Sequence, residues 1–169
     1  MEDVLTGRRY TVWAGAADAR GVGGVGVAVA GKWLEAVEGW ETVSPRVGVL
    51  RMAAAPVPVS VVVAYAPVEA AAEVDKEAFY GELDRVVGFE RQGRAVYVIG
   101  DMNARVGGQR EGEEKVVGAW GVGERNGNGS RLVPWAHERV LAVANTFFRK
   151  RRCRMPTWRS PAVAVGGSA

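Results

Sequence analysis

The chain has 169 residues, of which 48% are hydrophobic and 24% are charged, and its formal net charge is +3 at pH 7. This composition excludes a chain that is disordered throughout, and the length leaves room for one folded domain. The single cysteine and the single histidine exclude an internal disulfide framework and a zinc site made of several such residues. Carboxylate, amide, tyrosine and arginine side chains remain as candidates for chemistry.

Short apolar runs predict strands in the first part of the chain. Residues 10–14 and 25–30 are separated by a glycine-rich stretch, which favours a hairpin. Two further strands are predicted over residues 47–52 and 57–65. The second of these is nearly continuous in apolar residues, which is typical of a strand in the middle of a sheet.

The clearest helix is predicted over residues 71–92, where apolar side chains recur on one face among charged residues. A short buried strand is predicted over residues 95–99, and it stops at Gly100 and Asp101. Polar residues therefore emerge from the carboxyl end of a buried strand, which is where open α/β sheets place their chemistry.

The remainder of the chain is less regular. Residues 107–129 predict a long surface loop, and Ser130 is a predicted N-cap of a helix that reaches Val140. Residues 141–148 and 156–158 predict two more strands. Because strands outnumber helices and their order is mixed, the sequence predicts an α+β sandwich rather than a regular βαβ repeat.

Asp101 and Asn103 are the sharpest candidates for chemistry. Residues two apart in an extended chain face the same side, so this carboxylate and this amide would meet at one point. Such a pair can orient a water molecule and hold a phosphate oxygen. An Asx turn, in which both side chains bond to the local backbone, is the alternative interpretation of the same pair.

Tyr65 ends the predicted strand over residues 57–65. If the two buried strands are neighbours, its hydroxyl group lies at the same rim as Asp101. The alternative is a half-buried ring whose hydroxyl group is hydrated. For Thr157 the corresponding alternative is an ordinary strand residue.

A basic cluster lies near the end of the printed sequence and consists of Arg149, Lys150, Arg151, Arg152 and Arg154. It is a solvated loop, a patch like a nuclear-localisation signal, or a clamp on the DNA backbone. The neighbouring Phe148 and Trp158 are predicted to be core or packing aromatics, and the alternative is that they are platforms on which bases stack. Because the sequence shows no long apolar run and no apolar core of a signal peptide, we expect an intracellular protein with no membrane partner.

Eight blocks of the sequence, in this order, resemble the endonuclease/exonuclease/phosphatase superfamily. More narrowly, they are similar to the endonuclease domain of LINE-type (non-LTR) retrotransposons and to craniofacial development protein 2-like sequences. The resemblance covers residues 11–161. The blocks are GVGVAVAGKW, SPRVGVLRM, VVVAYAPVEA, KEAFYGELD, VYVIGDMNARVG, GVGERNGNGSRL, LAVANTFF and PTWRSP.

The resemblance implies a four-layered α/β sandwich in which helices flank two mixed β-sheets. It also implies hydrolysis of DNA phosphodiester bonds that depends on Mg²⁺ or Mn²⁺, with DNA as the partner. A reverse transcriptase is often fused to such a domain or encoded with it. On this basis residues 1–161 are an incomplete domain of the superfamily and residues 162–169 are an unstructured tail.

The resemblance also implies roles for single residues. Asp101 matches an aspartate that positions or activates the attacking water, and Asn103 matches an asparagine that helps to hold water and phosphate. Tyr65 matches a tyrosine that contacts the phosphate, and Thr157 matches a threonine that approaches the DNA backbone. The other candidates for contact with DNA, or for shaping the loop that makes it, are Asn126, Asn128, Arg151 and Arg152.

Two parts of the family's site find no match in the sequence: a metal-binding glutamate before the GVGVAVAGKW block, and an aspartate–histidine pair after PTWRSP. His137 lies in a predicted helix and matches neither. Losing such a group typically costs about 10²- to 10⁴-fold in rate. We therefore expect the nuclease domain to be inactive or weakly active. No residue of the sequence is predicted with certainty to bind the metal ion. The alternatives are a catalytically dead remnant that binds nucleic acid weakly and a small phosphatase of the same superfamily.

Overall fold

The computed structural model describes residues 10–19 and 21–151 of the chain. It divides into two compact units, Met1–Ala104 and Arg105–Ala169. The six strands of the described residues all lie in the first unit. The predicted boundary between a domain over residues 1–161 and a tail stays a prediction.

The first unit is built on a four-stranded sheet with the order β3-β4-β5-β6. Its strands are β3 (Val37–Ser44), β4 (Val47–Met52), β5 (Val59–Tyr65) and β6 (Ala95–Asp101). The pairings of β3 with β4 and of β4 with β5 are antiparallel, whereas β5 and β6 are parallel. The predicted central place of the apolar strand β5 is confirmed.

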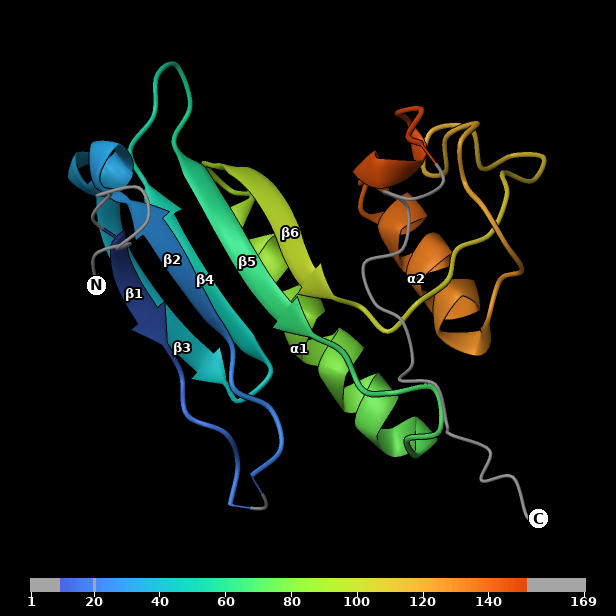
Figure 1. The fold of residues 1–169 in the computed structure, drawn as a ribbon, viewed down its shortest axis with the longest axis horizontal. Coiled ribbons are helices and arrows are strands. Elements are labelled where there is room, and N and C mark those ends of the chain that lie inside the picture. Colours follow the sequence, from blue (N-terminus) through green and yellow to red (C-terminus); the bar gives the residue numbers. More distant parts are fainter. Residues whose placement is uncertain (1–9, 20, 152–169) are drawn as a thin grey trace, which may run out of the picture. The chain divides into compact units, whose positions relative to one another are not determined.

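Helix α1 (Glu73–Glu90) connects the two parallel strands and packs on one face of the sheet (Figure 1). Glu73 and Asp75 lie in its first turn, where negative charge complements the helix dipole. Leu83 is fully buried, so its replacement by alanine is expected to cost about 2–5 kcal/mol of stability. The helix predicted over residues 71–92 is confirmed.

A hairpin lies over the other face of the sheet (Figure 1). Its strands β1 (Tyr10–Ala14) and β2 (Gly26–Ala30) pair antiparallel, as predicted, and a 3₁₀ helix η1 (Gly31–Ala36) follows. The N–H of Gly24 donates to the carbonyl oxygen of Pro45 at 2.7 Å, which ties the hairpin to the turn between β3 and β4. Two sheets with helices make an α+β fold, which confirms the predicted class.

Strand β3 was not predicted from the sequence. Its register against β4 shifts between Val37 and Gly39 and again between Thr42 and Ser44. Each shift interrupts the alternation of inward and outward side chains by which a strand is recognised. Opposite β3, a side chain at Gly48 would overlap the Trp40 ring, so the glycine leaves room for that ring.

The second unit contains α2 (Gly127–Glu138) and a 3₁₀ turn, η2 (Ala144–Thr146). The predicted cap of α2 is wrong: Asn126 rather than Ser130 is the N-cap, because its side chain accepts a hydrogen bond from the N–H of Gly129 at 2.9 Å. The helix therefore begins inside the segment expected to be a loop. None of the described helices is long and apolar enough to span a membrane.

The strand predicted over residues 141–148 is also wrong. The hydroxyl group of Thr146 donates to the carbonyl oxygen of Val143 and accepts from the N–H of Gly118, both at 2.7 Å. These bonds fold the segment into the η2 turn and hold it against the loop before α2. The strand predicted over residues 156–158 lies outside the described residues.

Candidate functional site

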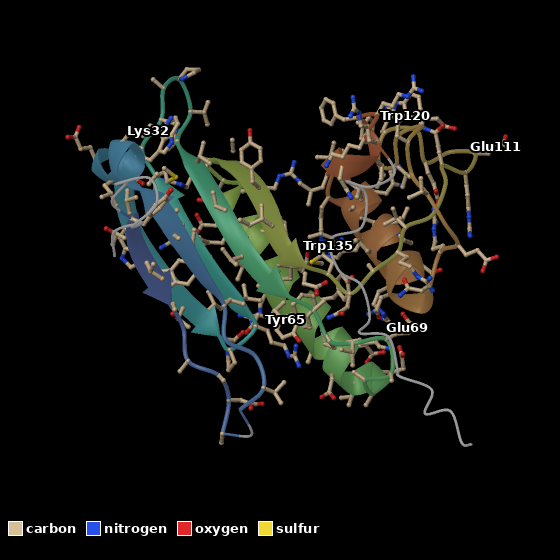
Figure 2. All side chains as sticks on the ribbon, in the orientation of Figure 1. Lys32, Tyr65, Glu69, Glu111, Trp120 and Trp135 are labelled. Atoms are coloured by element: carbon tan, nitrogen blue, oxygen red, sulfur yellow. The ribbon has the colours of Figure 1, made fainter. Side chains whose placement is uncertain are left out.

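Tyr65 and Asp101 lie side by side at the carboxyl edge of the sheet. They are Cα partners in the parallel pairing of β5 with β6, and Figure 2 labels Tyr65 at the end of β5. The N–H of Ala66 donates to the carbonyl oxygen of Asp101 at 2.9 Å, so the pairing continues past both residues. The predicted sharing of one rim by these strand ends is confirmed.

Gly100 sets the approach of β6 to β5 directly before Asp101. Its φ of 127° lies in the region that favours glycine. A Cβ atom at this position would overlap the backbone carbonyl oxygen of Ala64 on the neighbouring strand. The glycine therefore allows the close pairing that brings Asp101 level with Tyr65.

Asp101 and Asn103 do not adopt the extended geometry that the sequence predicts. Asn103 has a φ of 45°, and its N–H donates to Oδ1 of Asp101 at 2.8 Å, which is an Asx turn. The side-chain Nδ2 of Asn103 donates to the carbonyl oxygen of Ala66 at 2.8 Å. The carboxylate of Asp101 is exposed, and within the described part of the chain its Oδ2 accepts no hydrogen bond.

Arg46 is a residue of this rim that sequence analysis missed. Its Nη1 donates to the carbonyl oxygen of Tyr65 at 3.1 Å, and its guanidinium carbon lies 5.3 Å from the centre of the Tyr65 ring. A cation over the face of an aromatic ring is stabilised by the ring's negative face. Arg46 lies in the SPRVGVLRM block, but only the pairing of β4 with β5 brings it to Tyr65.

The donor set at the rim does not make up a metal centre. Among residues 10–19 and 21–151, no three His, Cys, Asp or Glu side chains are grouped so that they could hold a metal ion. Mg²⁺ is usually held by one or two carboxylates together with water and substrate phosphates. Asp101 supplies one carboxylate, of which Oδ1 already accepts a backbone hydrogen bond. This one carboxylate could hold Mg²⁺ or Mn²⁺ only together with water and a substrate phosphate, because the described rim residues form no group of three such ligands.

The other predicted site residues belong to the second unit. Oδ1 of Asn126 accepts hydrogen bonds from the N–H groups of Gly129 and Arg105, at 2.9 and 2.8 Å, so this side chain shapes the loop. Asn128 is 3% exposed in the first turn of α2. Arg151 is exposed. Thr157 and Arg152 lie outside the described residues.

Comparison with known proteins finds relatives of one kind. Craniofacial development protein 2 of Tragulus javanicus is 31% identical over 138 residues, which are 82% of this chain and 24% of that protein. The Bos taurus protein of the same name is 30% identical over 138 residues, 82% of this chain and 23% of that protein. The chain is homologous to craniofacial development protein 2. It spans about a quarter of the length of these curated relatives.

No family model matches the chain, and no solved structure matches it. The homology to craniofacial development protein 2 supports the corresponding part of the resemblance seen in the sequence blocks. The narrower assignment to LINE-type endonucleases stays a prediction.

Proposed function

We propose that the chain carries part of a DNA phosphodiesterase site of the endonuclease/exonuclease/phosphatase type, derived from a LINE-type retrotransposon endonuclease. The observation that supports this most is the pairing of Tyr65 with Asp101 at one sheet edge. The homology to craniofacial development protein 2 and the ordered sequence blocks agree with it. DNA is the proposed partner, a reverse transcriptase is its proposed genetic neighbour, and the nucleus is the proposed location.

The rim offers three groups that suit a phosphodiester. The guanidinium group of Arg46 supplies positive charge, and the Tyr65 hydroxyl group can donate a hydrogen bond to a phosphate oxygen. The carboxylate of Asp101 can accept a hydrogen bond from a water molecule and orient it. Asn103 has a supporting role, because its amide group ties the Asp101 turn to the backbone after β5.

Hydrolysis requires more than these groups supply. The attacked phosphate needs cations that offset its developing charge, and the leaving oxygen needs a proton donor. Arg46 meets the first need in part, and the neutral Tyr65 hydroxyl group adds only a hydrogen bond. We therefore expect the rim to bind the DNA backbone, and we expect hydrolysis by these groups alone to be absent or slow.

Duplex DNA binding in EDTA tests the rim without any contribution from a metal ion. Fluorescence anisotropy with a labelled duplex compares the wild-type chain with Arg46→Gln, and Arg85→Gln is the matched control. Arg85 is an exposed arginine on α1 that lies among the residues of a separate groove of the same unit. Loss of one phosphate contact should reduce the slope of log K against log salt by about 0.9.

The Asp101→Asn variant gives a second test of the phosphate site in the same experiment. In EDTA the Asp101 charge repels a bound phosphate, so its removal should tighten duplex binding while Arg46→Gln weakens it. Equal affinities and equal salt slopes for Arg46→Gln and Arg85→Gln would contradict the proposed phosphate site. So would an Asp101→Asn variant that binds duplex no more tightly than the wild-type chain.

A further inference from the structure

Three large aromatic side chains are exposed in the described part of the second unit, and Phe147 is the least exposed of them at 38%. Trp120 is 43% exposed and Phe148 is 66% exposed. Figure 2 labels Trp120 among the loops of this unit. The predicted core position of Phe148 is therefore wrong, whereas the alternative of a stacking platform is compatible with its exposure. Aromatic rings that remain in water leave apolar faces available to a flat partner.

Hydrogen bonds fix the segment around Phe148 beside the loop that carries Trp120. The N–H of Trp120 donates to the carbonyl oxygen of Thr146 at 2.9 Å, and the N–H of Gly118 donates to Oγ1 of the same threonine at 2.7 Å. A Cβ atom at Gly118 would lie 2.5 Å from the Thr146 carbonyl oxygen. The two segments therefore pack backbone to backbone, which fixes the segment that carries Phe148 next to the loop that carries Trp120.

Positive charge continues this surface. Arg149 places its guanidinium carbon 5.4 Å from the centre of the Trp120 ring, and Lys150 and Arg151 follow it along the chain. All three are exposed, and none forms an ion pair with a carboxylate of the described residues. Neighbouring cations without counter-charges favour binding of a polyanion, which releases condensed counterions when it is neutralised.

We infer that the aromatic–basic surface, made of Trp120, Phe148, Arg149, Lys150 and Arg151, binds single-stranded nucleic acid. The cations follow the phosphate backbone, and the exposed rings stack on bases. A single strand fits better than a duplex, because the bases of a duplex are already stacked on one another. Stacking contacts the face of a base and forms no base-specific hydrogen bonds, so the binding does not depend on the nucleotide sequence. The surface lies in the second unit and does not depend on the function proposed for the rim.

Fluorescence anisotropy with a labelled oligothymidylate of about 15 nucleotides, a length that covers known single-strand site sizes, tests the inference. Phe148→Ala should weaken binding about 5- to 100-fold, the cost of losing one stacked base. The matched control is Phe89→Ala, because Phe89 is also 66% exposed but lies on α1 of the first unit. Phe148→Trp should restore the affinity, which separates stacking from any effect on folding.

The charged part of the surface is tested by its salt dependence. Replacing Arg149, Lys150 and Arg151 together by glutamine should lower the salt slope for the single strand by about 2, since each contact contributes about 0.7. Arg85→Gln, which changes an exposed arginine of α1 outside both the rim and this surface, should leave the single-strand affinity and salt slope unchanged. Equal effects of Phe148→Ala and Phe89→Ala would overturn the inference. A Phe148→Ala variant that loses as much duplex affinity as single-strand affinity would overturn it too, and so would binding to anionic lipid vesicles in place of the oligonucleotide.

Discussion

Tyr65 and Asp101 stand opposite each other as the last paired residues of the parallel strands β5 and β6. Helix α1 carries the chain from the end of one strand back to the start of the other, so both strands run in the same direction. Parallel strands joined in this way end at the same edge of the sheet. Residues far apart in the sequence are thereby placed side by side without any direct bond between their side chains being needed.

Gly100→Ala should destabilise the first unit by about 2 kcal/mol or more. The φ of 127° and the overlap with the Ala64 carbonyl oxygen both oppose a side chain there. Chemical denaturation measures the loss. Gly93→Ala is the control, because a Cβ atom at Gly93 meets nothing within 4 Å. A Gly100→Ala variant as stable as the control would show that β6 pairs with β5 differently from the description above.

Two substitutions at Asp101 should differ in stability. Asp101→Asn keeps an oxygen that can accept from the N–H of Asn103, so its unfolding free energy should stay within about 0.5 kcal/mol of the wild-type value. Asp101→Ala removes the acceptor and should cost about 1 kcal/mol. Urea denaturation of the two variants compares them. Equal losses would mean that the Asx turn contributes nothing to the rim.

Glu90 should make the stability of the first unit depend on pH. Burial raises the pKa of this carboxyl group, but hydrogen bonds from Arg51 and Ser60 and the charges of Arg51 and Arg94 outweigh it, so the pKa is lowered from 4.5. A lowered folded-state pKa contributes stability above the ordinary value, and this stability is lost as the pH falls through the folded pKa. The unfolding free energy should therefore decrease as the pH drops below 4.5.

Glu90→Gln should flatten that pH dependence. It should also cost about 1.5–3 kcal/mol near neutral pH, the range for hydrogen bonds to charged groups. The carboxylate accepts from Ser60 Oγ at 2.5 Å and from Arg51 Nε at 2.9 Å. Glu77→Gln, at an exposed position of the same helix, should change neither quantity. If the unfolding free energy of Glu90→Gln depends on pH as it does in the wild-type chain, other carboxylates cause the loss of stability in acid.

The ion pair of Glu113 and Arg125 should stabilise the long loop before α2 against local opening. The two side chains form a bidentate pair with both N···O distances at 2.6 Å, and the Arg125 side chain is 4% exposed. Hydrogen bonding to Arg125 is the main reason that the pKa of Glu113 is lowered. Glu113→Gln should speed amide hydrogen exchange at the buried Val116 and Val117 by about tenfold or more.

Glu111→Gln is the matched control for this pair. Glu111 is exposed and lies in the same loop. Its substitution should leave the exchange rates at Val116 and Val117 unchanged. If both variants exchange at the wild-type rate, the ion pair does not stabilise the loop, and the apolar packing of the two valines alone orders it.

The sequence predicts the elements whose pattern is local. Strand β5 and helix α1 follow from a continuous apolar run and from a regular apolar face. The segment over residues 141–148 was predicted wrongly, because the bond from Gly118 to Thr146 joins it to a distant loop that no local pattern reveals. Strand β3 was missed because its bulges interrupt the alternation of side chains.

The candidate site was predictable to a similar extent. The shared rim of Tyr65 and Asp101 follows from two buried strands with polar ends. The turn at Asn103 could not be predicted in this way. Asparagine adopts both extended and left-handed backbone, so its residue type does not foretell the positive φ. Arg46 was missed since an arginine in a turn is ordinary until strand pairing brings it onto the Tyr65 ring.

The most direct measurement is nicking of a supercoiled plasmid in the presence of Mg²⁺ by the purified chain, run beside Asp101→Ala. The described rim offers one carboxylate and no grouped metal ligands, so we expect no nicking above that of the variant. Nicking by the wild-type chain that disappears in Asp101→Ala would contradict this account, because it would show that the rim hydrolyses DNA with the groups it already has.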